Sequence, residues 1–208
     1  MQMNKTTLAK ALLCTTLLAS LSGCVALVVG GAAAGAAATV DRRTLGAQTE
    51  DKAIAVKADL RLPRVAGPDS HVNAYAYNRQ VLLTGEVKEA SFRAAVEKEA
   101  KAIDGVLAVA NEITIGGPAT YTARSNDALI TAKVKASLVD MKTITATSFK
   151  VVTDKSVVYL MGRVTQREGQ VAADVARSVN GVSKVVKILE YITEDELRAL
   201  SPQSSVQL

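Results

Sequence analysis

The sequence predicts an α+β protein: two tandem αββαβ modules, each a three-stranded sheet packed by two helices, following a lipidated N-terminal tether. An internal repeat, an alternation of helical and strand periodicities within each copy, and the composition support this prediction. Aromatic residues make up 3% of the 208 residues and tryptophan is absent. Cores of Ala, Val, Leu and Ile are small, which favours compact modules over one large core.

The repeat rests on three landmarks separated by 76 or 77 residues. It defines copies at residues 50–116 and 125–192. The matched pairs are Asp51-x-x-Ile54 with Asp127-x-x-Ile130, Val81–Val87 with Val158–Val164, and Ile103–Val106 with Val179–Val182.

Each copy opens with apolar residues at i, i+4 and i+8, which indicates a helix face. In the second copy we expect Ser125-Asn126-Asp127 to cap this helix. Two β-rich runs joined by a short polar turn then predict a hairpin. The predicted strands are His71–Tyr77 with Val81–Val87, and Ser148–Val152 with Val157–Val164.

A second amphipathic helix and a final strand complete each copy. The helices are predicted from Phe92 to Ile103 and from Val171 to Val179, and the strands over Val106–Ile115 and Val182–Ile192. Gly105 and Gly181 follow these helices, where a glycine accepts the left-handed conformation of a C-cap. A strand–helix–strand connection within one sheet is expected to cross over right-handed.

Gly85 and Gly162 lie late in the second strand of each copy. Glycine inside a strand indicates a bulge or a close approach of other backbone. We interpret both as structural, because a Cβ there would push the following helix off the sheet. Direct contact with a ligand is the alternative.

The N-terminus has the order of a lipoprotein signal peptide. Residues 1–23 combine a basic start with an apolar stretch, Leu8–Leu21, too short to span a bilayer. Leu21-Ser22-Gly23-Cys24 resembles the lipobox of bacterial lipoproteins, which implies cleavage before Cys24 and its lipidation. An ordinary signal peptide is the alternative. Because Cys14 leaves with the signal, the mature chain has no free thiol.

Residues 24–49 are predicted to form the lipidated cysteine and a Gly/Ala-rich tether near the lipid surface; a buried helix over Val25–Val40 is the alternative. Residues 193–208 form an acidic tail. Thr193-Glu194-Asp195-Glu196 resembles a capping box that opens one or two helical turns through Leu200.

Nothing in the residue pattern indicates catalysis. The single histidine, His71, has no second His or Cys for a metal site and no paired nucleophile near it in sequence. Gly116-Gly117-Pro118 is a linker, because the strand–glycine loop–helix order with a lysine is missing. We expect a non-enzymatic protein with no metal and no cofactor.

The two copies differ in net charge. Residues 50–115 hold nine basic and ten acidic residues, whereas residues 126–192 hold ten basic and six acidic. Basic residues beside exposed apolar ones suit an anionic lipid surface. We predict that Leu129, Lys133, Lys135 and Met141 dock on anionic phospholipid, with Lys142 and Lys150 nearby, although the predicted helix lacks the Trp or Tyr typical of such anchors. Alternatively, Leu129 widens the core face and the lysines are simply solvated.

The motifs Asp-x-x-Ile, Val-x-Leu-x-Gly-x-Val and a helix ending in Gly-Val-x-x-Val resemble the BON domain. Two such copies behind a lipobox and Asp41-Arg42-Arg43-Thr44 resemble the dual BON-domain outer-membrane lipoproteins, the division- and stress-associated lipid-binding lipoprotein family. The resemblance covers essentially the whole mature chain.

This resemblance implies an outer-membrane protein that is lipid-anchored, faces the periplasm, binds anionic phospholipid through its second BON domain and supports envelope integrity. Val25 in place of Asp favours the outer membrane by similarity to lipoprotein sorting. The alternative is a periplasmic protein–protein adaptor that uses its sheet edges to meet outer-membrane assembly or peptidoglycan-remodelling proteins. Peptidoglycan binding is a third possibility without a motif, and nucleic acid is not expected as a partner.

Overall fold

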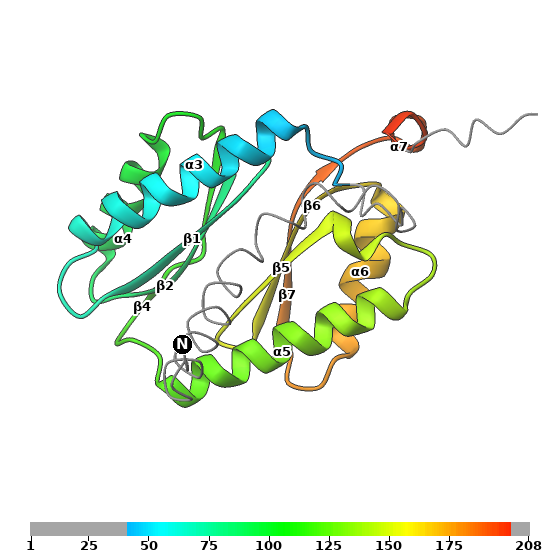
Figure 1. Ribbon diagram of the computed structural model, residues 1–208. Helices are drawn as coiled ribbons and strands as arrows, with labels where there is room; N and C mark the ends of the chain where they lie inside the picture. Colours follow the sequence, from blue (N-terminus) through cyan, green and yellow to red (C-terminus); the bar gives the residue numbers. More distant parts are fainter. Residues whose placement is uncertain (1–40, 201–208) are drawn as a thin grey trace, which may run out of the picture. The chain divides into compact units, whose positions relative to one another are not determined.

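The computed structural model describes residues 41–200, and they form two successive α/β repeats (Figure 1). The lipobox, Cys24 and most of the predicted tether lie outside the described residues, as do residues 201–208. The α+β fold class predicted from the sequence is confirmed.

The first repeat runs from Leu45 to Ile115 and the second from Tyr121 to Tyr191. The elements of the first are α3 (Leu45–Arg61), a 3-10 turn (Leu62–Arg64), β1 (His71–Tyr77), β2 (Gln80–Val87), α4 (Ala90–Lys101), β3 (Ala108–Asn111) and β4 (Thr114–Ile115). Those of the second are α5 (Tyr121–Asp140), a 3-10 turn (Ala146–Ser148), β5 (Phe149–Asp154), β6 (Val157–Val164), α6 (Gln166–Ser178) and β7 (Lys184–Tyr191), with α7 (Glu194–Leu200) after it.

Both sheets have the same topology. The hairpin strands pair antiparallel, β1 with β2 and β5 with β6. The strand that follows the second helix then joins parallel to the central strand, so the orders are β1-β2-β3, with β4 also on β2, and β5-β6-β7. The outer strands β1 and β5 therefore lie at sheet edges.

The opening helices begin earlier than predicted. α3 starts at Leu45 and α5 at Tyr121, and their N-caps are Thr44 and Thr120, whose side chains accept the backbone N–H of Ala47 and Ala123. Ser125 therefore lies inside α5 and does not cap it. A threonine hydroxyl caps a helix as a serine hydroxyl does. Because the helices begin at these threonines, the first repeat extends upstream into the predicted tether and the second into the predicted linker.

The last strand of the first repeat is broken, whereas that of the second is continuous. Ile113 turns into the core with 2% of its surface exposed. Its N–H donates to Asn111 Oδ1 at 3.2 Å, so residues 112–113 separate β3 from β4. The single strand predicted over Val106–Ile115 is wrong at this point.

Each repeat has its own apolar core between its helices and one face of its sheet (Figure 1). In the first repeat, Ile54 of α3 and Val96 of α4 pack with Leu83 of β2. In the second, Val134 of α5 and Ala173 of α6 pack with Leu160 of β6. Alanine and valine supply much of this contact, as expected from the composition.

The repeated aspartates hold the hairpin turns, a role that the sequence analysis did not assign. Asp51 accepts the backbone N–H groups of Asn78 and Arg79, both at 2.7 Å. Asp127 does the same for Lys155 and Ser156, at 2.9 and 2.8 Å. All four turn residues have positive φ, which non-glycine residues adopt only at some cost. Each buried carboxylate therefore ties the first helix to a strained turn.

The strand glycines face neighbouring backbone, not a helix. Gly85 has φ +106°, and a Cβ there would lie 1.9 Å from His71 O on β1. At Gly162 a Cβ would lie 2.5 Å from Ser148 O. The prediction that a Cβ would displace the helix is therefore wrong; the obstacle is the adjacent chain. Gly105 and Gly181 both have positive φ, but they lie four and three residues after the last residue of the preceding helix. The C-caps of these helices are Ala102 and Val179, so the prediction that the glycines form the C-caps is wrong.

Gly85→Ala is expected to lower the free energy of unfolding by about 2 kcal/mol or more, because it combines a backbone clash with a left-handed φ. Urea unfolding of the full chain measures this. Gly117→Ala is the control, since a Cβ there meets nothing within 4 Å. Equal unfolding midpoints for the two variants would contradict the close-approach interpretation.

Candidate functional site

The helices cover one face of each sheet, and the other faces of the two sheets meet. A third apolar cluster fills this seam between the repeats. It joins Tyr77 and Leu82 of the first repeat to Val152, Tyr159 and Met161 of the second. Burial raises the pKa of Tyr159, and the negative charge of Glu112 acts in the same direction, so its hydroxyl stays protonated.

Polar contacts join the repeats at both ends of the seam. At one end, Gly85 N–H donates to Asp154 Oδ2 at 2.9 Å, and Lys155 Nζ lies 3.1 Å from the buried carboxylate of Glu86. At the other, Asn78 Nδ2 donates to Glu190 at 2.5 Å, and Arg163 also binds Glu190. A turn residue of each repeat thus reaches the strands of the other.

Arg42, which precedes the first helix, binds the second repeat. Its Nη1 and Nη2 donate to Glu168 Oε2 and Oε1 at 2.7 and 2.8 Å, and Nη1 also donates to Arg163 O. Arg42 and Glu168 are 6% and 2% exposed. Burial raises the pKa of Glu168, but hydrogen bonds from Arg42 and from the Thr165 N–H outweigh it and leave that pKa below its ordinary value.

The next residue, Arg43, binds the first repeat. It donates to Asp51 Oδ2 at 2.7 Å, and its guanidinium carbon lies 4.3 Å from the centre of the Tyr77 ring. Asp41 accepts two further bonds from the same guanidinium. We call Asp41, Arg42 and Arg43 the clasp. It brings both repeats together at the point where the described chain begins.

α5 exposes three large apolar side chains: Tyr121 at 84%, Leu129 at 61% and Val139 at 69%. Its core stripe is Ile130, Val134 and Leu138, on the opposite side. Tyr121 supplies the aromatic residue that the sequence analysis found missing. A helix capped at Ser125 excludes Tyr121, whereas the observed helix begins with it.

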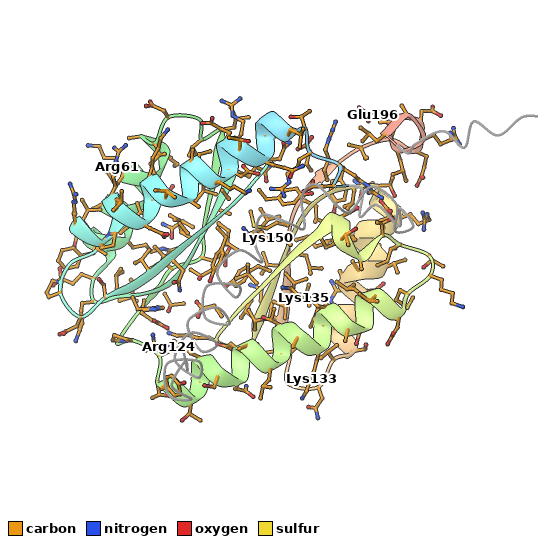
Figure 2. All side chains as sticks on the ribbon, viewed as in Figure 1. Arg61, Arg124, Lys133, Lys135, Lys150 and Glu196 are labelled. Atoms are coloured by element: carbon orange, nitrogen blue, oxygen red, sulfur yellow. The ribbon has the colours of Figure 1, made fainter. Side chains whose placement is uncertain are left out.

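The predicted residues occupy different sides of α5. Leu129 is exposed, and Lys133 lies about one turn further along the helix. Figure 2 labels Lys133 and Lys135 on α5. Lys135 is exposed as well, but two positions along a helix turn by about 200°, so it lies on the far side of Leu129 from Lys133. Met141, the C-cap residue, packs partly against the core of the second repeat.

The other two lysines also differ in their surroundings. Lys142 is exposed in the loop after α5. Lys150 turns into the seam, where its Nζ donates to Ala76 O at 3.1 Å and lies 5.6 Å from the centre of the Tyr75 ring. Burial lowers the pKa of Lys150, and the charge of Arg43 lowers it further.

Within residues 41–200, no group of His, Cys, Asp and Glu side chains is arranged to hold a metal ion. The ring Nδ1 of His71 lies 3.5 Å from Asn73 Nδ2. None of the helices in this part of the chain is both long enough and apolar enough to cross a membrane.

Arg42→Ala is expected to lower the free energy of unfolding by about 3 kcal/mol, because it leaves a buried carboxylate without its partner. Arg167→Ala, which removes an exposed pair with Glu194, should change it by less than about 1 kcal/mol. Urea unfolding of both variants checks this. A loss at Arg42 no larger than that at Arg167 would show that the clasp does not stabilise the fold.

The clasp also predicts a pH dependence. Because the pKa of Glu168 is lower in the folded state than its ordinary value of 4.5, its stabilisation is present above that pH and is lost as the pH falls through the folded pKa. The difference in unfolding free energy between the wild type and Glu168→Gln should therefore be largest near neutral pH and shrink below about pH 4.5. A difference that stays constant from pH 7 to pH 3 would exclude this ionic contribution.

The BON domain family matches residues 50–117 and 126–193. Over 174 residues the chain is 35% identical to "Outer membrane lipoprotein DolP" of Haemophilus influenzae, covering 83% of this chain and 90% of that relative. It is 32% identical to a "21 kDa hemolysin" of Actinobacillus pleuropneumoniae over 74% of this chain and 80% of the relative. "Osmotically-inducible protein Y" of Escherichia coli shares 48% identity over 61 residues, 29% of this chain and 30% of its own. The chain therefore belongs to the BON-domain family and contains two BON domains.

Proposed function

We propose that the protein is a non-catalytic lipoprotein of the outer membrane, anchored through Cys24 on the periplasmic side, whose α5 docks on anionic phospholipid. The lipobox and the similarity to an outer-membrane lipoprotein support the anchor and the location. The outward face of α5 supports the lipid contact. Binding to the membrane in this way would serve envelope integrity.

The outward face of α5 carries an apolar stripe, with the exposed Ser125 as a polar residue within it. Eighteen residues complete five helical turns, so Tyr121 and Val139 lie on one line about 27 Å long. Leu129 lies beside this line, and the exposed Ala132 and Ala136 lie between its ends. We call these five residues the α5 stripe. A helix that only packs against a core needs apolar residues on its inner side alone. Core packing therefore does not account for the apolar residues on the outer side of α5.

Lysines flank the α5 stripe, Lys133 on one side and Lys135 on the other. A basic residue near an anionic membrane surface contributes about 1 kcal/mol. Apolar side chains that enter the headgroup region add to this by burial, and Tyr is typical of that interface. This combination of an exposed apolar stripe with basic borders is the observation on which the proposal rests.

A comparison of α5 with α3, the equivalent helix of the first repeat, shows which feature is specific to α5. α3 exposes Leu45, Val56 and Leu60. Lys57 occupies the position of Lys133, but Asp59 occupies that of Lys135. Both helices therefore have apolar outward residues. The border of α3 that carries Asp59 also carries Lys52, seven residues earlier on the same side, so these charges offset each other, whereas the matching border of α5 carries Lys135 with Ala128 in place of Lys52. We therefore expect anionic lipid to bind the second repeat in preference to the first.

The combined Lys133→Ala and Lys135→Ala variant should bind phosphatidylglycerol vesicles about thirtyfold more weakly at low salt, since two lysines contribute about 2 kcal/mol. Sedimentation with vesicles measures this, using the full chain with Cys24→Ser and produced without lipid. The difference should shrink as salt is raised, because salt screens surface charge.

Lys52→Ala combined with Lys98→Ala is the matched control, because it removes the same net charge from exposed positions of the first repeat. It should bind as the unmodified chain does. If the unlipidated chain ignores phosphatidylglycerol vesicles at low salt, or binds phosphatidylcholine vesicles equally well, the docking proposal fails.

A further inference from the structure

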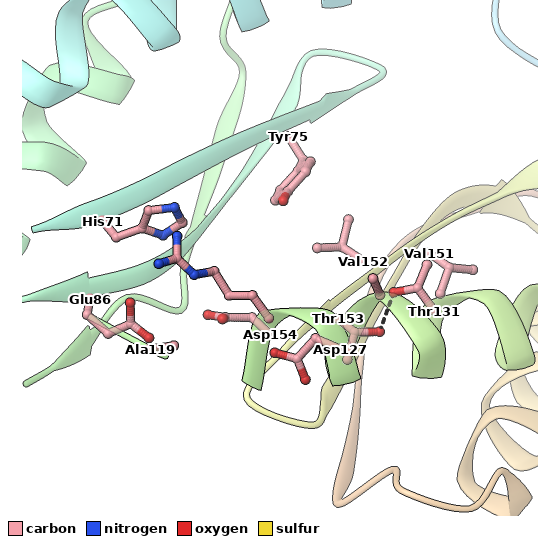
Figure 3. A pocket seen from close by; sticks show the side chains of 12 residues that line it. His71, Tyr75, Glu86, Ala119, Asp127, Thr131, Val151, Val152, Thr153 and Asp154 are labelled. Atoms are coloured by element: carbon pink, nitrogen blue, oxygen red, sulfur yellow. Dashed lines mark hydrogen bonds between the residues drawn. The ribbon is translucent and has the colours of Figure 1, made fainter. Parts of the chain in front are cut away.

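A groove runs between α5 and the edge strand β5. Two cavities, of about 410 and 210 Å³, lie along it, and Val151 lines both. α5 forms one wall of each, through Ala128 and Thr131 in the larger cavity and through Leu138 and Val139 in the smaller. Figure 3 shows the larger cavity, in which Thr153 of β5 is hydrogen-bonded to Thr131 of α5, whereas Asp154 lies on the side of Glu86 of the first repeat.

The outer edge of β5 presents unused backbone groups to this groove. The two-residue turn after Asp154 makes Asp154 and Val157 a hydrogen-bonded pair, and such pairs alternate along an antiparallel ladder. The N–H and C=O groups of Val151 and Thr153 therefore point away from β6. Within the described part of the chain, no hydrogen bond satisfies the N–H of either residue.

β5 lacks the usual protection of an edge strand. Proteins commonly place a bulge, a proline or an outward lysine at such an edge. β5 contains no proline and pairs with β6 without a bulge. Its single lysine, Lys150, turns into the seam to bind Ala76 O. An unprotected edge beside a helix-walled groove is a template for an added strand.

The two ends of the groove carry opposite charge. Lys135 borders the cavity next to Phe149, where β5 begins. At the other end, Asp154 and Asp127 line the larger cavity together with Glu86, and Arg124 and His71 lie at its side. Burial raises the pKa of Asp154, and the charges of Glu86 and Asp127 add to this, against the Gly85 N–H bond and the charge of Lys155, which lower it. The three carboxylates outnumber the two cations at this end, Arg124 and Lys155.

We propose that this groove binds an extended polypeptide segment of another protein, which adds antiparallel to β5 as a fourth strand. Antiparallel pairing places the N-terminal end of the segment at Asp154 and its C-terminal end at Lys135. A basic residue at the first end and an acidic one at the second therefore match the groove. Alternate apolar side chains of the segment face Val139 and Leu138 on α5.

The probe is a peptide about eight residues long, Lys-Thr-Val-Thr-Val-Thr-Val-Glu, within the usual length of a strand. It is added to the unlipidated full chain with Cys24→Ser, without lipid. The amide N–H groups of Val151 and Thr153 should exchange with deuterium at least about tenfold more slowly when the peptide is bound. A peptide N-methylated at alternate residues, which cannot complete the ladder, should give no protection.

Two charge reversals on α5 separate this site from the lipid-docking surface. Lys135→Glu should weaken the peptide about threefold, and a peptide ending in Lys should recover the loss. Lys133→Glu, outside the groove, should leave peptide binding unchanged while it impairs vesicle binding. No protection of Val151 and Thr153 by the peptide, or equal binding of the N-methylated peptide, overturns the proposal. Protection by phosphatidylglycerol vesicles alone would assign the groove to a lipid acyl chain and overturn it as well.

Discussion

The packing of one sheet against the other is the constraint on which this protein depends. Each sheet has helices on a single face, and the opposite face carries large apolar side chains such as Leu82 and Met161. In an isolated repeat those side chains would meet water, and the helix-side core is built largely from alanine and valine. Small domains with thin cores are marginally stable. Duplication solves this problem, because each repeat covers the open face of the other.

The clasp joins the two repeats through residues that are neighbours in the chain. Arg42 reaches the second repeat and Arg43 the first, from positions immediately before α3. The residues that lead out of the tether therefore also join the repeats. A buried Arg–carboxylate pair adds little stability against an apolar alternative, but it is specific in geometry. We infer that its main contribution is to select one arrangement of the two repeats.

Much of the fold follows from local patterns, and the exceptions have identifiable causes. β1 and β6 coincide with the predicted strands, and the capping box at Thr193 and Glu196 forms as expected. The first helix of each repeat begins earlier than the apolar periodicity predicts, because its N-cap, Thr44 or Thr120, lies upstream of that periodicity. The clasp and the roles of Asp51 and Asp127 were not predictable, since they depend on residues distant in sequence. For α5, periodicity indicated Leu129 but not Tyr121, whose exposure depends on the earlier helix start.

Native-state hydrogen exchange tests the claim that the two repeats form one cooperative unit most directly. Leu82 on β2 and Leu160 on β6 are both fully buried central-strand residues, one in each repeat. If the seam makes the repeats interdependent, their amides should open with the same free energy and the same denaturant dependence. Two distinct opening free energies, with one sheet exchanging while the other stays protected, would contradict this account.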